Sequence, residues 1–194
     1  MKKKKSQSEI IQQLTDRELN FHLIYTQFAL LTISVISGIF LFKDLSTFFE
    51  LIRFDSSIYS MGISSGAAVV LLDMLLMKWV PGHYYHDGGI NERIFKRRSF
   101  SGIFFLTLLI AFSEEILFRG IIQTHFGWIA ASLIFAIVHI RYWGHWFLIV
   151  NILILSFWIG GIYEYSHHNL LTVIVMHFVI DFFSGLLIKY KRDR

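Results

Sequence analysis

Long apolar runs recur along this chain and limit its fold more than any other feature of the sequence. Runs of this kind are typical of transmembrane helices, because only helices and closed barrels satisfy the whole backbone in lipid, and barrel-like alternation is lacking here. We therefore predict an all-α, polytopic membrane bundle with about six transmembrane helices. The expected spans are residues 22–42, 58–80, 100–123, 128–142, 146–163 and 169–188.

The composition agrees with a membrane protein and excludes several kinds of site. Hydrophobic residues make up 55% of the chain and charged residues 16%, whereas soluble domains carry about 25% charged residues. The chain has no cysteine, which excludes disulfides, thiolate nucleophiles and cysteine-based zinc sites. The net charge of +4 does not indicate a nucleic-acid partner, because the basic residues lie beside the apolar runs, as topology determinants do.

The distribution of lysine and arginine predicts the topology. With a cytoplasmic N-terminus, fifteen basic residues lie on the cytoplasmic side, and only Lys43 and Arg53 lie outside. This asymmetry predicts that both termini are cytoplasmic. We expect residues 1–20 to form a basic, polar cytoplasmic tail and residues 21–194 an integral membrane domain of the cell membrane, with an uncleaved anchor.

Three charged residues interrupt the third expected span. Each charge at the centre of a membrane helix costs about 2.5–3.5 kcal/mol on insertion scales, so Glu114, Glu115 and Arg119 must face protein or a wet cavity. Glu115 and Arg119 are four residues apart and can pair on one helical face. Glu114 lies about 100° around the helix from Glu115 and is left to face a cavity. A purely structural clamp between helices is the alternative.

Two later spans add histidines and a further carboxylate. The segment FAIVH places His139 four residues after Phe135, and HFVID places His177 and Asp181 on one helical face. A single histidine inside a membrane is usually a packing residue. Two histidines and an aspartate beside an unpaired glutamate instead suggest a Glu/His pair that activates water, with donors that stabilise an oxyanion.

The segments SEEILFRG, FAIVH and HFVID resemble the motifs EExxxR, FxxxH and HxxxN/D of the CPBP intramembrane protease family. This family contains type II CAAX prenyl endopeptidases and bacteriocin-processing or immunity proteins, formerly grouped as Abi. The resemblance implies a catalytic core at about residues 100–188 and an endopeptidase that acts on a membrane-associated peptide or protein. It further implies that Glu114 and His139 polarise water, that His177 and residue 181 stabilise the oxyanion, and that Glu115 and Arg119 have supporting roles.

Asp181 stands where many members of that family have asparagine. An ionised aspartate would repel an oxyanion, so we expect Asp181 to act as a neutral acid that donates a hydrogen bond alongside His177. A metal-free glutamate mechanism without a cofactor is favoured, because HExxH is absent and no two motif histidines share a helical turn. A metal-dependent protease that uses the same residues, a non-catalytic immunity or scaffold protein, and a proton-coupled transporter are the alternatives.

Other polar residues have simpler interpretations. Ser113 neighbours Glu114 but points elsewhere on the helix, so we expect it to aid helix packing. His167 and His168 are expected in a solvated external loop. Asp73 interrupts the second span, either as a cavity residue or as a partner of a neighbouring helix, and its position outside the family core favours a structural role.

Overall fold

The computed structural model describes residues 7–191, with side chains from residue 10 onward, and this part is helical without β-strands. Five helices are long and apolar enough to cross a membrane, which confirms the polytopic helical bundle. They are α2 (Asp16–Leu41), the continuous helix Ile58–Trp79 that contains α4 (Ser64–Trp79), the continuous helix Phe100–Phe126 that contains α6 (Phe100–Glu115) and α7 (Thr124–Phe126), α9 (Trp146–Tyr165) and α10 (Leu170–Tyr190).

The predicted fourth span, 128–142, is not a single full-length helix. Helix α8 covers only Trp128–Val138, which is 11 residues and about 16 Å at the usual rise per residue. The His139 ring nitrogen Nδ1 donates a hydrogen bond of 2.6 Å to the Phe135 carbonyl, the group to which the His139 backbone N–H would donate in a continuing helix. The backbone turns at His139 and then forms a 3-10 turn at Ile140–Tyr142. The helix therefore ends part-way through the bundle, at a motif histidine.

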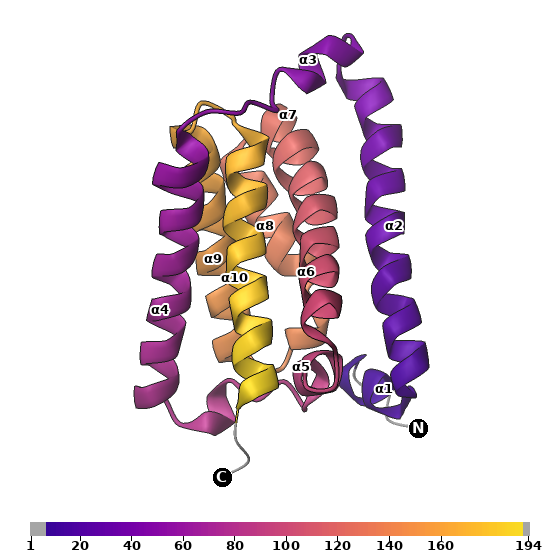
Figure 1. The fold of residues 1–194 in the computed structure, drawn as a ribbon. Coiled ribbons are helices and arrows are strands. Elements are labelled where there is room, and N and C mark those ends of the chain that lie inside the picture. Colours follow the sequence, from indigo (N-terminus) through magenta and orange to yellow (C-terminus); the bar gives the residue numbers. More distant parts are fainter. Residues whose placement is uncertain (1–6, 192–194) are drawn as a thin grey trace.

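Helix α10 lies at the centre of the bundle, between α4 and α6, with α8 and α9 behind it and α2 at one side (Figure 1). In the most apolar stretches of the helix Phe100–Phe126 and of α10, 39% of residues are buried, against 11% in α2. The described part of the chain begins and ends at the same end of the bundle, where α1 (Gln7–Gln13), α5 (Ile90–Phe95) and the last turn of α10 lie, and α3 (Leu45–Phe49) lies at the opposite end. The assignment of the end with the termini to the cytoplasm remains a prediction.

Two glycines of the continuous helix Ile58–Trp79, one in its first, π-helical part (Ile58–Ile63) and one in α4, fix how this helix lies beside α10. A Cβ atom on Gly62 would lie 2.7 Å from the Thr172 carbonyl oxygen, and one on Gly66 would lie 2.9 Å from the Met176 carbonyl oxygen. Small residues four positions apart allow membrane helices to approach this closely. Because both contacts have the same offset along the two helices, they set the register between α4 and α10.

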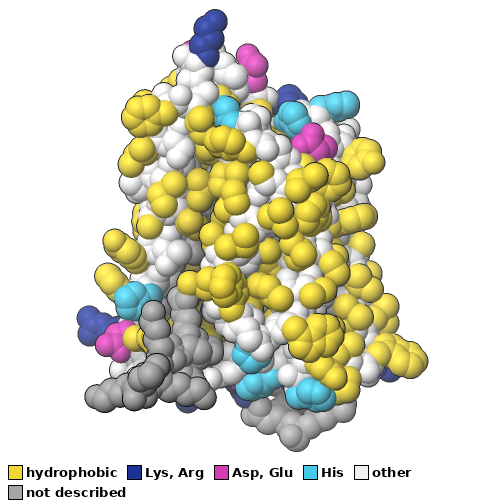
Figure 2. Space-filling view, turned by 180° about the vertical axis from the view of Figure 1, so that it is seen from behind, with side chains coloured by type: hydrophobic (Ala, Val, Ile, Leu, Met, Phe, Trp, Pro, Cys, Tyr) yellow, Lys and Arg dark blue, Asp and Glu magenta, His cyan; other side chains and the backbone are white. Residues whose placement is uncertain are grey.

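The outer surface is apolar where lipid would surround it. Figure 2 shows hydrophobic side chains across the middle of one face, with His, acidic and basic side chains gathered towards its two ends. Ile129 and Ile137 of α8 and Ile154 and Trp158 of α9 are exposed large hydrophobic residues. A continuous exposed apolar surface of this kind would be a liability in water. The chain is therefore an integral membrane protein.

Candidate active site

The first motif lies where α6 passes into a wider, π-helical segment, Ile116–Gln123. The segment ends with the Thr124 N–H bonded to the Arg119 carbonyl, five residues back. Such π-helical turns are rare in proteins, and many of those known lie at functional sites. The widened turn carries Arg119 and Gln123 into the interior, where both are buried.

The predicted pair between Glu115 and Arg119 is present. Arg119 Nε lies 3.2 Å from Glu115 Oε2, and both side chains are fully buried. The guanidinium also donates to Gln123 Oε1 at 3.2 Å and to Ser156 Oγ of α9 at 2.9 Å. A buried charge needs such compensation. The spacing of Gln123, four residues after Arg119, could have indicated its role, whereas Ser156 has no local signal in the sequence.

Glu115 also contacts the third motif, a contact that sequence reasoning missed. Its second oxygen, Oε1, accepts a hydrogen bond from His177 Nδ1 at 2.7 Å. Since a carboxylate only accepts, this bond assigns a proton to Nδ1 and turns Nε2 towards Asp181, whose Oδ2 lies 3.5 Å away. Glu115 therefore links Arg119 with His177 and orients the imidazole, a role familiar from carboxylate–histidine pairs.

The orientation of His139 follows from the end of α8. Because the Phe135 carbonyl can only accept, the 2.6 Å contact assigns the proton of His139 to Nδ1. The neutral ring then carries its free lone pair on Nε2. The ring is also packed against Phe135, with the ring centroids 4.6 Å apart. His139 is thus held as a hydrogen-bond acceptor.

All four residues predicted to be catalytic line one cavity of about 990 Å³. Glu114 comes from α6, His139 from the end of α8, and His177 and Asp181 from α10. Within residues 7–191, no hydrogen bond or ion pair engages the half-buried Glu114 carboxylate, which therefore faces the cavity. The cavity extends to the end of the bundle that holds the termini, where residues from α1 and α5 line it.

Two further predictions concern polar residues near this cavity. Ser113 is buried and donates to Gln27 Oε1 at 2.6 Å, so it holds α6 to α2, and its predicted packing role is confirmed. Asp73 lines the cavity from α4 and forms no ion pair or hydrogen bond with other described residues. Of the two interpretations of Asp73, the structure therefore shows the cavity residue, and the structural role that its position favoured, as a partner of a neighbouring helix, is not observed.

A metal site in a protein needs at least three suitable side chains that converge on one point. Among the residues that the structure describes, no three His, Cys, Asp or Glu side chains are arranged to hold a metal ion. Both ring nitrogens of His177 are already directed at carboxylates.

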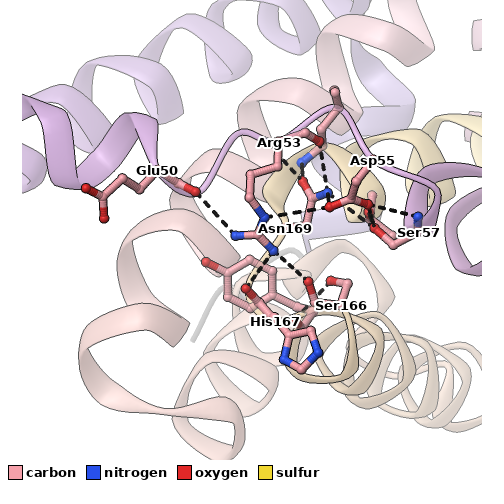
Figure 3. A network of polar contacts seen from close by, with 10 residues as sticks. Glu50, Arg53, Asp55, Ser57, Ser166, His167 and Asn169 are labelled. Carbon is pink, nitrogen blue, oxygen red and sulfur yellow. Dashed lines mark hydrogen bonds and ion pairs between the residues drawn. The ribbon is translucent and has the colours of Figure 1, made fainter.

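A second polar cluster, at the opposite end of the bundle, closes that end by joining two loops through hydrogen bonds (Figure 3). Arg53 donates to the carbonyls of Ser166 and His167, each at 2.8 Å, and buried Asn169 donates to the Arg53 carbonyl at 2.9 Å. Hydrogen bonds from the side chain and backbone of Ser57 hold the pKa of Asp55 below its usual range. The cluster ties the turn between α9 and α10 to the segment before α4, and its polar groups are occupied.

The predicted loop histidines lie next to this closure. His167 and His168 are both exposed and have positive φ angles of 55° and 62°. His168 pairs with Glu164 at 2.8 Å, and neither histidine lines the main cavity. Their expected place in a solvated loop is confirmed.

The chain is similar to known proteins over the region that holds the site. The family model described as type II CAAX prenyl endopeptidase Rce1-like matches residues 96–183, which include all three motifs. The chain is 44% identical over 171 residues to the uncharacterized protein YpbD of Bacillus subtilis (strain 168), a match that covers 87% of this chain and 89% of that protein. No solved structure matches the chain. The chain therefore belongs to the Rce1-like type II CAAX prenyl endopeptidase family, a family of membrane proteases.

Proposed function

We propose that this protein is an intramembrane endopeptidase of the cell membrane that hydrolyses a peptide bond of a membrane-associated substrate through water activated by Glu114 and His139. The observation that carries the proposal is that an unpaired carboxylate, Glu114, shares one cavity with His139, His177 and Asp181 inside an apolar bundle. Ionisable side chains are costly to place inside a membrane, so their presence around one cavity indicates a function. The family to which the chain belongs supports the same reaction class.

Water activation requires a base and an acceptor that positions the water. Glu114 is free to take a proton, because its carboxylate has no partner among residues 7–191. His139 accepts a hydrogen bond from the same water at Nε2, since its Nδ1 proton is held by Phe135. The water oxygen attacks the carbonyl carbon, and the displaced proton goes to Glu114.

The oxyanion formed by this attack needs donors that are fixed in advance. Protonated His177 supplies Nε2–H, and its ring is oriented by the bond to Glu115. Asp181, as a neutral acid, supplies O–H beside it. The 3.5 Å between the two groups is longer than a usual hydrogen bond, so both are able to turn to a substrate oxygen. As the C–N bond breaks, Glu114 returns its proton to the leaving amine, which yields a carboxylic acid and an amine.

The proposal is tested by product analysis with two histidine variants. Purified protein in lipid nanodiscs is incubated with membrane-anchored peptides, with and without a prenyl group, and the products are identified by mass spectrometry. His139→Phe keeps an aromatic ring but removes the acceptor, so the products should disappear. His125→Phe is the matched control, because His125 makes the same bond to the carbonyl four residues back, at 2.8 Å, outside the cavity.

Cleavage by wild type and His125→Phe, but not by His139→Phe, is the expected result. Equal cleavage by all three proteins would overturn the role of His139. A folded wild-type protein that cleaves none of the peptides would favour the non-catalytic alternative, in which the polar residues only hold helices together.

A further inference from the structure

Asp73 carries a carboxylate that lines the cavity but has no part in the proposed reaction. It lies within the membrane-spanning part of α4, outside all three motifs and outside the region matched by the family model. Its side chain is partly buried and lines the same cavity as Glu114. Across residues 7–191, no lysine, arginine or histidine lies within ion-pair distance of it. Within the described part of the chain, this carboxylate therefore has no counter-charge.

The contacts between α4 and α10 locate Asp73 along the bundle. Gly62 lies beside Thr172 and Gly66 beside Met176, and both helices run from the α3 end to the end with the termini. The same offset places Asp73 level with residue 183, beside the cavity-lining Ser184. This level is six residues beyond His177, or roughly 9 Å along the helix axis. An extended peptide rises about 3.3 Å per residue, so roughly 9 Å corresponds to about three substrate residues.

Arg141 and His177 also line the cavity, but both have partners other than Asp73. Arg141 lies on the ring of Tyr142, 4.4 Å from its centroid, and donates to the Tyr142 hydroxyl. His177 is held by Glu115. An unpaired carboxylate in a membrane cavity attracts a cation, and such a pair gives specificity by favouring one substrate charge over another.

The geometry points to Asp73 as a substrate-binding residue that selects a cationic amino or guanidinium group about three residues from the bond that is cleaved. This inference rests on the proposed peptidase function and adds the charge of the substrate to it. The cation comes either from a lysine or arginine side chain or from a free α-amino group. The carboxylate binds it as an ion pair in the part of the cavity nearer the termini.

The test compares peptides that differ only in one charge. Each peptide carries lysine, acetyl-lysine or glutamate at one position, with the amino terminus either free or blocked, and cleavage by the full-length protein in nanodiscs is read by mass spectrometry. Wild type should cleave the lysine peptide about 10-fold faster than the acetyl-lysine peptide when lysine lies about three residues from the bond, a ratio expected for a partly buried ion pair. A requirement for the free terminus instead of the side chain would identify the α-amino group as the cation.

Two variants of Asp73 and one control connect this ratio to the carboxylate. Asp73→Asn should bring the lysine-to-acetyl-lysine ratio close to one, and Asp73→Lys should favour glutamate at the same position. Asp44→Asn is the matched control, because Asp44 caps α3 at the opposite end of the bundle and asparagine also caps helices. The control should keep the wild-type ratio. An unchanged ratio in Asp73→Asn, or a wild-type ratio of one at every position, would overturn the inference.

Binding separates this inference from the proposed function. The lysine and acetyl-lysine peptides are each titrated onto Glu114→Gln and onto the double variant Glu114→Gln/Asp73→Asn, and the four dissociation constants are measured. If no protein cleaves any peptide, the proposed function fails. A preference for lysine that depends on Asp73 would still support the binding role, and the same preference without Asp73 would refute it.

Discussion

Replacement of Glu115 by glutamine tests the network that joins the first and third motifs. Glu115 is fully buried and accepts from Arg119 at 3.2 Å and from His177 at 2.7 Å. Glutamine has one acceptor oxygen for these two donors, and its NH₂ group would face one of them. The change also leaves the buried guanidinium of Arg119 with only the neutral partners Gln123 and Ser156.

The expected loss of stability is large because both partners are buried. Removal of one member of a buried ion pair typically costs about 3–5 kcal/mol, and the remaining neutral hydrogen bonds place Glu115→Gln near the lower end, at about 3 kcal/mol. Arg119→Leu should cost a similar amount, since it leaves Glu115 uncompensated. The double variant should cost less than the sum of the two single variants by about 0.5–3 kcal/mol, the range of coupling seen for contacting residues.

The assay is the free energy of unfolding in mixed micelles, measured by denaturant titration for the single and double variants. Glu92→Gln is the matched control, because Glu92 and Lys96 form an ion pair with the same four-residue spacing, at 3.1 Å, with both side chains about a third or more exposed. This exposed pair should contribute at most about 0.5 kcal/mol. A Glu115→Gln variant as stable as Glu92→Gln, or strictly additive effects with Arg119→Leu, would refute the reasoning.

Two further predictions concern the oxyanion and the metal. Asp181→Asn should retain substantial activity and extend it to higher pH, because an amide cannot lose its donor by ionisation, whereas Asp181→Leu should lose about 10²–10³ in rate; pH–rate profiles of the three proteins decide, and an Asp181→Asn variant as inactive as Asp181→Leu at every pH would show that the carboxylate itself is needed. Strong chelators should leave activity intact, and elemental analysis should find no stoichiometric zinc; one zinc per chain, with activity lost on its removal and restored on its return, would contradict the glutamate mechanism.

The parts of this site that depend on spacing within one helix could be predicted from the sequence. The Glu115–Arg119 pair is such a case, since residues four apart are neighbours on a helix. The hydrogen bond between Glu115 and His177 could not be predicted, because it joins residues 62 positions apart and depends on how α6 packs against α10. The role of Glu115 was therefore assigned only in part.

Two other differences have local and tertiary causes. The expected span 128–142 was too long because a side chain, that of His139, competes with the backbone for the Phe135 carbonyl, and hydropathy does not register such competition. The place of Asp73 in the cavity depends on the rotation of α4, which is set by the contacts of Gly62 and Gly66 with α10. The apolar character of α4 gave no direction for this side chain.

The most direct test of the account is the turnover rate of Glu114→Gln on one identified peptide substrate. Glutamine preserves the size of the side chain but cannot accept the proton from water, and loss of a general base typically lowers turnover by about 10²–10⁴. Glu50→Gln is the matched control, because Glu50 is exposed at the opposite end of the bundle and does not line the cavity. We predict turnover of Glu114→Gln reduced by that factor, with unfolding stability no lower than that of wild type and Glu50→Gln at the wild-type rate. Turnover of purified, folded Glu114→Gln equal to that of wild type would contradict the account.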